Sequence, residues 1–350
     1  MTDQTDPGQG SPSPGQKSPG GAPTPHDAIF RRVFGVPANA ASQLRAVLPP
    51  GLAARLDLSR LALAPGSFVD ESLRWRHSDL LFTAPLDGRD AFIYVLTEHQ
   101  SSDDPLMAFR VSRYMTRIWD AYLRAHPWAR KLPAIIPMVV YHGKRRWTSP
   151  VQLLDLIDLD PATKKEAGAY LPRIEFLLDD LSGIDDRQLR DRNLPPPAEI
   201  TLVLLRDAPG NPHIVAELRP RSGTLRAVLD QPGGGETFIA LLTYIEVTSE
   251  APVGDLHDLT TSLGPDAEEA YMTIAETLRA EGRAEGEARG EARGEARAKA
   301  AGILVVFEQR GIDVDDKSLG RIESCTDLDT LNGWFRRSFK VDKASDLFEE

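Results

Sequence analysis

Two apolar segments constrain the fold of this chain most: SDLLFTA (78–84) and DAFIYVLTEHQ (90–100). They are joined through PLDGR, whose Asp-Gly pair is typical of tight hairpin turns, so the pattern predicts an antiparallel hairpin. The apolar runs AIIPMVVYHG (134–143) and RIEFLLDDL (173–181) predict further strands. ITLVLLRD (200–207) fits a strand or a helix.

Helices are predicted around these strands. Thr24-Pro25 reads as an N-cap followed by proline at the first helical position, and this helix resumes after Pro37 toward Leu48. Residues 107–122 carry an apolar stripe with helical period. The order helix, strand, strand, helix, strand predicts an α/β fold, a mixed sheet with helices packed on it.

Composition divides the chain into regions. The Gly/Pro/Ser-rich residues 1–25 are expected to be disordered because they cannot bury enough apolar surface. Further regions follow: an α/β domain (26–182), a mostly helical region (183–280), a charged low-complexity helical linker (281–301) and short C-terminal helices (302–350). Glycine recurs every fourth residue in the linker, which makes its helix marginally stable.

Charge is distributed unevenly, although the net charge is −11. Residues 26–150 hold 17 Lys/Arg against 11 Asp/Glu, whereas residues 151–350 hold 23 against 39. We therefore expect only the basic half to bind a polyanion such as DNA. The sequence contains no run of 18 apolar residues, so no membrane span is predicted. The lone Cys325 excludes an internal disulfide framework. A cytoplasmic protein is the expectation.

Two carboxylates mark the predicted hairpin. Asp79 opens one strand and Glu98 ends its partner, so antiparallel pairing brings them to one end of the sheet, together with Gln100. Alternation places Glu98 and Gln100 on one face and His99 on the other. Two carboxylates suit Mg²⁺, Mn²⁺ or Ca²⁺, and such an ion can activate water for phosphodiester hydrolysis. Gln100 can orient that water but cannot take its proton.

Other interpretations of these residues remain open. Aspartate and glutamate often flank strands as turn or edge residues. His77 and His99 suggest a softer Zn²⁺ site, which the opposite face of His99 disfavours.

Two basic clusters follow the carboxylates. Arg110, Arg113, Arg117 and Arg124 fall within a narrow arc of the predicted helix, opposite its apolar stripe, and Lys144, Arg145 and Arg146 follow the next strand. Both clusters fit a DNA backbone, although ordinary solvated surfaces carry such residues too.

Five segments occur in order in the N-terminal half: PHDAIFRRVFG, GSFVDESLRWRHSDLLFTA, IYVLTEHQSS, MAFRVSRYM and IIPMVVYHG. They resemble the recombination-promoting nuclease/putative transposase family of the PD-(D/E)XK nuclease superfamily. The resemblance covers about residues 25–180. It implies a restriction-endonuclease-like αβββαβ core, DNA cleavage dependent on Mg²⁺ or Ca²⁺, and a role in promoting recombination.

The resemblance also implies roles by position. Asp79 takes the place of the first motif aspartate and Glu98 that of the second acid, whereas Gln100 stands where the superfamily usually has lysine. His26-Asp27 matches a family motif, so Asp27 either reaches the site or caps its helix. Glu71 is another candidate acid.

Three alternatives remain. In the first, the chain is a catalytically inactive, transposon-derived DNA-binding or protein-interaction protein. In the second, the acidic C-terminal half is the functional part and serves as a protein-interaction module. A transposase with an Asp-Asp-Glu core is disfavoured because no third carboxylate can be placed. A homodimer is open, since cutting both strands often needs two copies.

Overall fold

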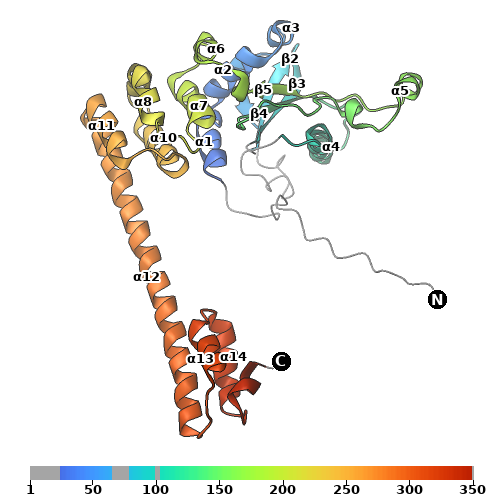
Figure 1. Ribbon diagram of the computed structural model, residues 1–350. Coiled ribbons are helices and arrows are strands. Elements are labelled where there is room, and N and C mark those ends of the chain that lie inside the picture. Colours follow the sequence, from blue (N-terminus) through green and yellow to red (C-terminus); the bar gives the residue numbers. More distant parts are fainter. Residues whose placement is uncertain (1–23, 65–78, 99–102, 349–350) are drawn as a thin grey trace, which may run out of the picture. The chain divides into compact units, whose positions relative to one another are not determined.

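The computed structural model describes residues 24–64, 79–98 and 103–348 (Figure 1). The chain forms two compact units, one extending to Tyr271 and the other beginning at Met272. The predicted disordered tail lies outside the described residues except for its last two positions. Within the described ranges, no helix is long and apolar enough to span a membrane.

The first unit begins with helices whose starts follow from local chemistry. Helix α1 (Pro25–Phe34) is capped at its N-terminus by a capping box: the Asp27 N–H donates to the Thr24 hydroxyl, and the Thr24 N–H donates to the Asp27 carboxylate. Helices α2 (Pro37–Val47) and α3 (Pro50–Ala53) follow. The predicted helix after Thr24 and its continuation after Pro37 are confirmed.

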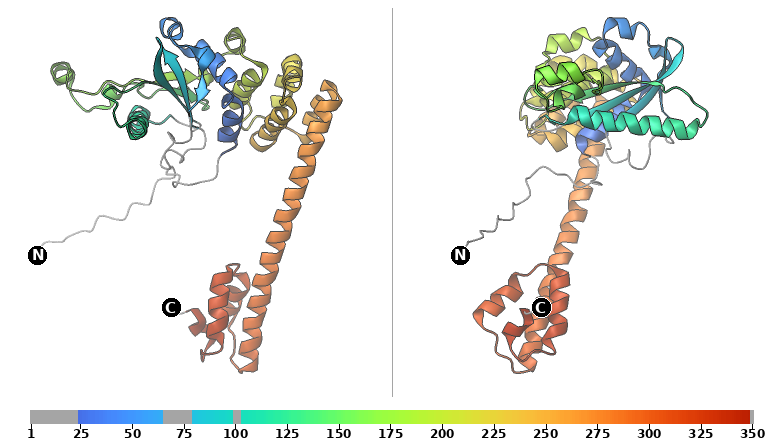
Figure 2. Two further views of the ribbon diagram at one scale, coloured as in Figure 1. Left: turned by 180° about the vertical axis from the view of Figure 1, so that it is seen from behind. Right: turned by 90° about the vertical axis from the view of Figure 1, so that its right-hand side faces the viewer.

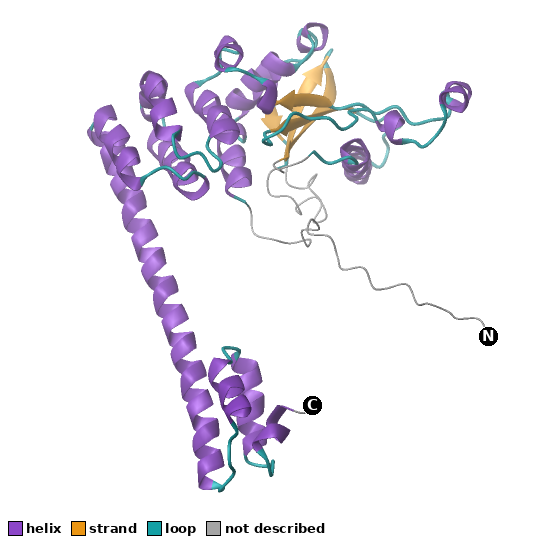
Figure 3. Ribbon diagram, in the orientation of Figure 1, coloured by secondary structure: helices purple, strands orange, loops and turns teal. Residues whose placement is uncertain are grey.

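A five-stranded mixed sheet, shown in orange in Figure 3, lies at the centre of this unit. Its strands, in spatial order, are β1 (Ala62–Leu63), β2 (Leu80–Leu86), β3 (Arg89–Glu98), β4 (Ala134–Tyr141) and β5 (Leu177–Asp180). The pairs β1–β2 and β2–β3 are antiparallel, and β3–β4 and β4–β5 are parallel. The predicted mixed sheet is confirmed, and β1 is an addition too short to show a sequence pattern.

Strands β2 and β3 form the predicted hairpin. Asp87 and Gly88 occupy its turn with φ values of 48° and 73°, the left-handed backbone that type I′ turns require at both central positions. Glycine tolerates this conformation because it has no Cβ. The turn sets a register in which Leu81 pairs with Tyr94 and Leu80 with Val95.

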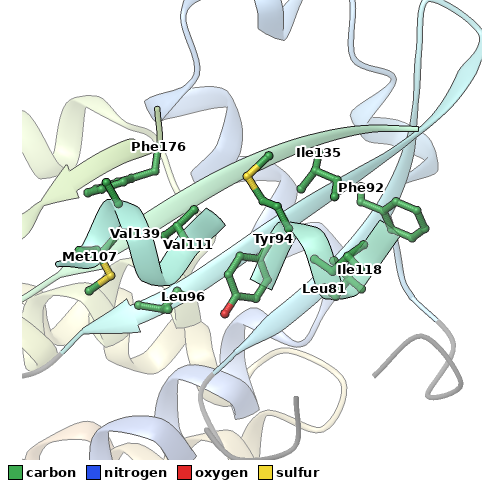
Figure 4. Packing of buried hydrophobic residues seen from close by; sticks show 12 residues of the cluster. Leu81, Phe92, Tyr94, Leu96, Met107, Val111, Ile118, Ile135, Val139 and Phe176 are labelled. Carbon is green, nitrogen blue, oxygen red and sulfur yellow. The ribbon is translucent and has the colours of Figure 1, made fainter. Parts of the chain in front are cut away.

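Helix α4 (Met107–Ala125) covers one face of the sheet. Its predicted apolar stripe is buried against β2, β3 and β4, and the packed side chains are seen in Figure 4: Leu81, Phe92, Tyr94, Leu96, Met107, Val111, Ile118, Ile135, Val139 and Phe176. A helical segment, three strands, α4 and β4 follow one another in the chain. This is the αβββαβ order of a restriction-endonuclease-like α/β fold.

Helices α1, α2 and α7 (Pro196–Asp207) lie on the other side of the sheet (Figures 1 and 2). The ambiguous run 200–207 therefore forms a helix, and four of its residues from Leu202 to Leu205 are almost completely buried. The remaining helices of the unit are α5 (Pro161–Ala167), α6 (Asp186–Asp191), α8 (Ile214–Leu218), α9 (Ser222–Leu229), α10 (Gly234–Thr248) and α11 (Val253–Leu263).

The second unit has its own core. Helix α12 (Pro265–Gln309) runs through the repeat 281–301 and continues to Gln309, so the segment after residue 301 does not begin a separate helix. Gly311, with φ 67°, follows its end. Helices α13 (Asp316–Ser324) and α14 (Leu328–Ser338) complete the unit. Its buried side chains include Ile303, Phe307, Ile322, Leu331 and Trp334.

Candidate active site

The backbone places the two candidate acids at the same end of the central hairpin. Asp79 directly precedes β2, one residue beyond the Leu80–Val95 pair, and Glu98 is the last residue of β3, where it pairs with Tyr141 of β4. Position 79 therefore lies beside position 96, two residues short of Glu98. With strands about 4.8 Å apart and a rise of about 3.3 Å per residue, the two Cα positions are roughly 8 Å apart.

Strand alternation places positions 79 and 98 on the same face of the sheet. Leu81, Tyr94 and Leu96 all pack on the α4 face, and positions 79 and 98 differ from them by even steps along their strands. At Glu98 the structure describes the backbone but not the side chain, and Gln100 and His99 lie outside the described residues. Glu71 and His77 lie outside them too. The sequence predicted only that Asp79 and Glu98 lie at one end of the sheet, and their shared face follows from the register.

The carboxylate of Asp79 is bound by a tyrosine that is not among the site residues predicted from the sequence. The Tyr94 hydroxyl donates to Asp79 Oδ2 at 2.6 Å, and the side chain of Tyr94 is buried on the sheet (Figure 4). Burial raises the pKa of the Tyr94 phenol well above its ordinary value, and the negative charge of Asp79 raises it further. Tyr94 is therefore a permanent hydrogen-bond donor to the candidate metal ligand at neutral pH.

Helix α4 brings positive charge close to this pair. The positive charge of Arg110 lowers the pKa of Tyr94, against the larger raising effects of burial and of Asp79. The Arg110 guanidinium also donates to Asp104 Oδ2 at 2.6 Å. Only 14% of the Arg110 side chain is exposed. Its placement differs from the predicted one, since Arg110 lies at the edge of the apolar stripe rather than opposite it. The Asp104 carboxylate holds it there.

Aromatic packing extends from Tyr94 along α4. The rings of Tyr94 and Tyr114 have centroids 5.4 Å apart, and the Arg117 guanidinium lies 6.0 Å from the Tyr114 ring. Sequence spacing contains a signal for Tyr94: it lies four residues before Glu98 and so occupies the same face of β3. Tyr114, on another element, could not be assigned from the sequence.

The other α4 arginines lie farther along the helix. Arg113 and Arg124 are exposed, Arg117 is half-buried, and at 100° per residue the three lie within about 40° of one another. Together with Arg110, whose charge acts on Tyr94, they form a basic flank that runs from the first turn of α4 to its last turn.

The second basic cluster is held close to the segment that follows β3. Asp103 accepts hydrogen bonds from the Thr148 N–H at 2.8 Å, from the Thr148 hydroxyl at 3.1 Å and from the Ser149 N–H. Desolvation opposes ionisation, but these hydrogen bonds outweigh it and lower the pKa of Asp103 to about 2. Lys144, Arg145 and Arg146 are exposed just before the clamped residues, and Arg146 also donates to the Gly183 carbonyl.

Both residues of the His26-Asp27 motif have partners in the structure, Asp27 within its own helix and His26 on distant elements. The Asp27 carboxylate accepts from the Thr24 N–H, which is the capping role. His26 Nδ1 lies 2.7 Å from the Tyr244 hydroxyl, and its ring is 5.3 Å from that of His142. The motif therefore joins α1 to α10 and to the residue after β4.

The donor chemistry of the hairpin end is compatible with a hard divalent cation. Asp79 and Glu98 offer carboxylate oxygens, which Mg²⁺ and Ca²⁺ prefer, and Mg²⁺ commonly uses only one or two protein carboxylates with water as its other ligands. Among the side chains that the structure describes, no group of three or more His, Cys, Asp or Glu could enclose a metal ion. Glu98, whose side chain is not among them, is the second ligand of the hypothesis.

Comparisons with known proteins agree with the sequence resemblance. A family model described as "Putative transposase, YhgA-like" matches residues 24–229. Recombination-promoting nuclease RpnD of Escherichia coli O157:H7 is 33% identical over 265 residues, which cover 73% of this chain and 94% of the relative. Recombination-promoting nuclease RpnA of Escherichia coli (strain K12) is 30% identical over 261 residues, covering 74% and 85%.

A further relative carries a different name. The inactive recombination-promoting nuclease-like protein RpnE of Escherichia coli (strain K12) is 30% identical over 278 residues, covering 74% of this chain and 83% of the relative. No solved structure matches the chain. The similarity therefore extends both to proteins named as nucleases and to proteins named as inactive nuclease-like proteins.

Proposed function

The chain belongs to the YhgA-like putative transposase family, and from this premise we propose that it is a metal-dependent DNA endonuclease that promotes recombination. Relatives named recombination-promoting nucleases support a nuclease role. The observation that carries the proposal for this chain is the register of the hairpin, which puts positions 79 and 98 on one face at one end of the sheet.

In the proposed site, Asp79 and Glu98 hold a divalent cation, Mg²⁺ or Ca²⁺ with Mn²⁺ as a further candidate. Such an ion supplies charge neutralisation at the phosphate and lowers the pKa of bound water. Tyr94 holds the Asp79 carboxylate by hydrogen bonding to Oδ2. Gln100 orients the attacking water. The phosphate backbone of DNA binds to the basic residues around the site: Arg113, Arg117, Arg124, Lys144, Arg145 and Arg146, with Arg110 at its inner edge.

The test is cleavage of supercoiled plasmid by the full-length protein in Mg²⁺, Mn²⁺ or Ca²⁺. Wild type is expected to nick or linearise the plasmid, whereas Asp79→Ala and Glu98→Ala lower the rate at least a hundredfold. Asp90→Ala is the matched control, because Asp90 is exposed on β3 at the opposite end of the same strand from Glu98. Equal cleavage rates for wild type and both site variants would show that neither Asp79 nor Glu98 takes part in the reaction.

The second candidate function is DNA binding without cleavage. It is favoured by the relatives named as inactive and by Gln100 at the position where the superfamily usually has lysine. Binding of plasmid in every ion without any nicking would select this function. If the wild type neither binds nor cuts plasmid, the result would instead favour the acidic C-terminal half as the functional part, as a protein-interaction module.

A further inference from the structure

The loop between α4 and β4, residues 126–133, exposes a tryptophan almost completely. The Trp128 residue is 92% exposed. The tryptophans before and after it in the sequence are packed: the Trp119 indole donates to the Pro133 carbonyl at 2.9 Å, and the Trp147 ring packs edge-on against Tyr141. The large apolar surface of Trp128 therefore contributes little to the fold and is available for an interaction.

The loop that carries Trp128 is held at several points. His126 stacks on Tyr122 with ring centroids 4.3 Å apart, and the Ala129 N–H donates to the His126 carbonyl at 2.9 Å. The Trp119–Pro133 hydrogen bond fixes the end of the loop against α4. A ring presented on a fixed loop loses less entropy on binding than one on a free loop.

The charge around Trp128 favours a polyanion. Arg124, Arg130 and Lys131 are exposed within four residues of it. The sequence contains no aspartate or glutamate from residue 121 to residue 154. An exposed aromatic ring among cations is the arrangement by which proteins bind single-stranded nucleic acid, with bases on the ring and phosphates on the cations.

The basic flank of α4 connects this loop with the candidate active site. From Arg110 to Arg124 the helix rises about 21 Å, since each residue adds about 1.5 Å. Successive base pairs are about 3.4 Å apart, so this length corresponds to about six base pairs. DNA that lies along the flank with a phosphate at Asp79 would reach the Trp128 loop after about that many nucleotides.

We propose that Trp128 stacks on an unpaired base of the DNA substrate while Arg124, Arg130 and Lys131 bind the neighbouring phosphates. The preferred substrate is then DNA with a single-stranded segment about six nucleotides from the cleavage position, rather than continuous duplex. This inference rests on the proposed nuclease function, which it deepens by naming the class of substrate.

The test measures binding without cutting. Full-length protein in chelator is titrated into a fluorescent duplex with a single-stranded tail and into the same duplex with blunt ends. Wild type should prefer the tailed DNA. Trp128→Ala should weaken tailed binding roughly five- to a hundredfold, the range for loss of one stacked base, with less than about twofold change on blunt duplex. Trp128→Phe should retain most of the affinity.

Two further variants separate stacking from other effects. Tyr170→Ala removes a ring that is 89% exposed elsewhere on the same unit and should change neither affinity. Arg130→Gln should weaken both DNAs and lower the salt slope of binding by about 1, whereas Trp128→Ala should leave the slope unchanged because no charge is lost.

The outcomes are distinct from those of the plasmid assay. Equal effects of Trp128→Ala on tailed and blunt DNA, or no effect on either, overturn the stacking site even if wild type cuts plasmid. Failure of wild type to cut plasmid in any ion overturns the proposed nuclease instead. If wild type binds neither DNA, the stacking site is overturned as well.

Discussion

The phenol of Tyr94 donates a 2.6 Å hydrogen bond to one carboxylate oxygen of Asp79, and this bond joins the buried centre of β3 to the residue that precedes β2. The bond crosses the hairpin on the α4 face, where Tyr114 and Arg110 also approach Tyr94. A carboxylate that binds a metal ion must hold one orientation, and partners that fix metal ligands commonly contribute ten- to a hundredfold to affinity or activity. Tyr94 is in the position to do this for Asp79.

Tyr94→Phe should leave the fold intact and lower the cleavage rate about ten- to a hundredfold, because the ring stays packed while its hydrogen bond is lost. The concentration of Mg²⁺ needed for half-maximal rate should rise as well, which a change in packing alone would not produce. Tyr122→Phe is the control, since Tyr122 packs edge-on against Phe92 in the same cluster. Unchanged ion dependence in Tyr94→Phe would exclude the positioning role.

Divalent cations should stabilise the wild type against heat, because an ion that binds only the folded chain adds stability that grows with its concentration. At about 100 times the dissociation constant the gain is about 2.7 kcal/mol. Asp79→Ala and Glu98→Ala should show no such gain in thermal unfolding with and without Mg²⁺ or Ca²⁺. Asp90→Ala should behave as wild type. A full ion-induced shift in both site variants would place the ion elsewhere.

Asp103→Asn should loosen the loop that carries the basic cluster 144–146, because all three hydrogen bonds end on Asp103 Oδ2 and a neutral amide oxygen accepts them more weakly than a carboxylate. We expect a loss of about 1 kcal/mol, a typical value for such hydrogen bonds after allowance for solvent exposure. The folded pKa of about 2 lies below the ordinary 3.8, so the stabilisation is complete above pH 3.8 and is lost as the pH falls through about 2. Urea unfolding of both proteins from pH 2 to pH 6 measures the convergence. A difference that stays constant down to pH 2 would contradict this origin.

Asp179→Ala should destabilise the first unit by about 3–5 kcal/mol, since it leaves a largely buried guanidinium without its carboxylate. Asp179 is 3% exposed, and Arg192 donates to its two oxygens at 2.6 and 3.0 Å, while Gln43 donates to it as well. Urea unfolding measures the change.

The exposed pair Arg187–Asp191, four residues apart on α6, provides the comparison for Asp179. Asp191→Ala should cost less than about 0.5 kcal/mol, because water screens an exposed ion pair. Similar costs for the two aspartate variants would mean that the Asp179–Arg192 pair is solvated in the folded protein.

Local chemistry determined the elements that the sequence predicted correctly. Thr24-Pro25 and Asp27 dictate where α1 begins, and Asp87-Gly88 dictates the hairpin turn, because each interaction spans only a few residues. The alternation of β3 placed Glu98 and Gln100 on one face, whereas the face of position 79 followed only from the register of the β2–β3 pair. The run 200–207 stayed ambiguous because a helix buried all round shows no amphipathic period. The segment after residue 301 was wrongly separated from α12, since a glycine-rich repeat does not by itself end a helix.

The sequence by itself determined the family, the hairpin and the two acids at its end. Only the tertiary structure decided what surrounds them: Tyr94 on Asp79, Arg110 held by Asp104, and Asp103 clamping the loop before β5. These contacts join residues on different elements, and their distances depend on how α4 packs across the sheet. No periodicity or spacing encodes that packing, because it results from the fit of many buried side chains at once.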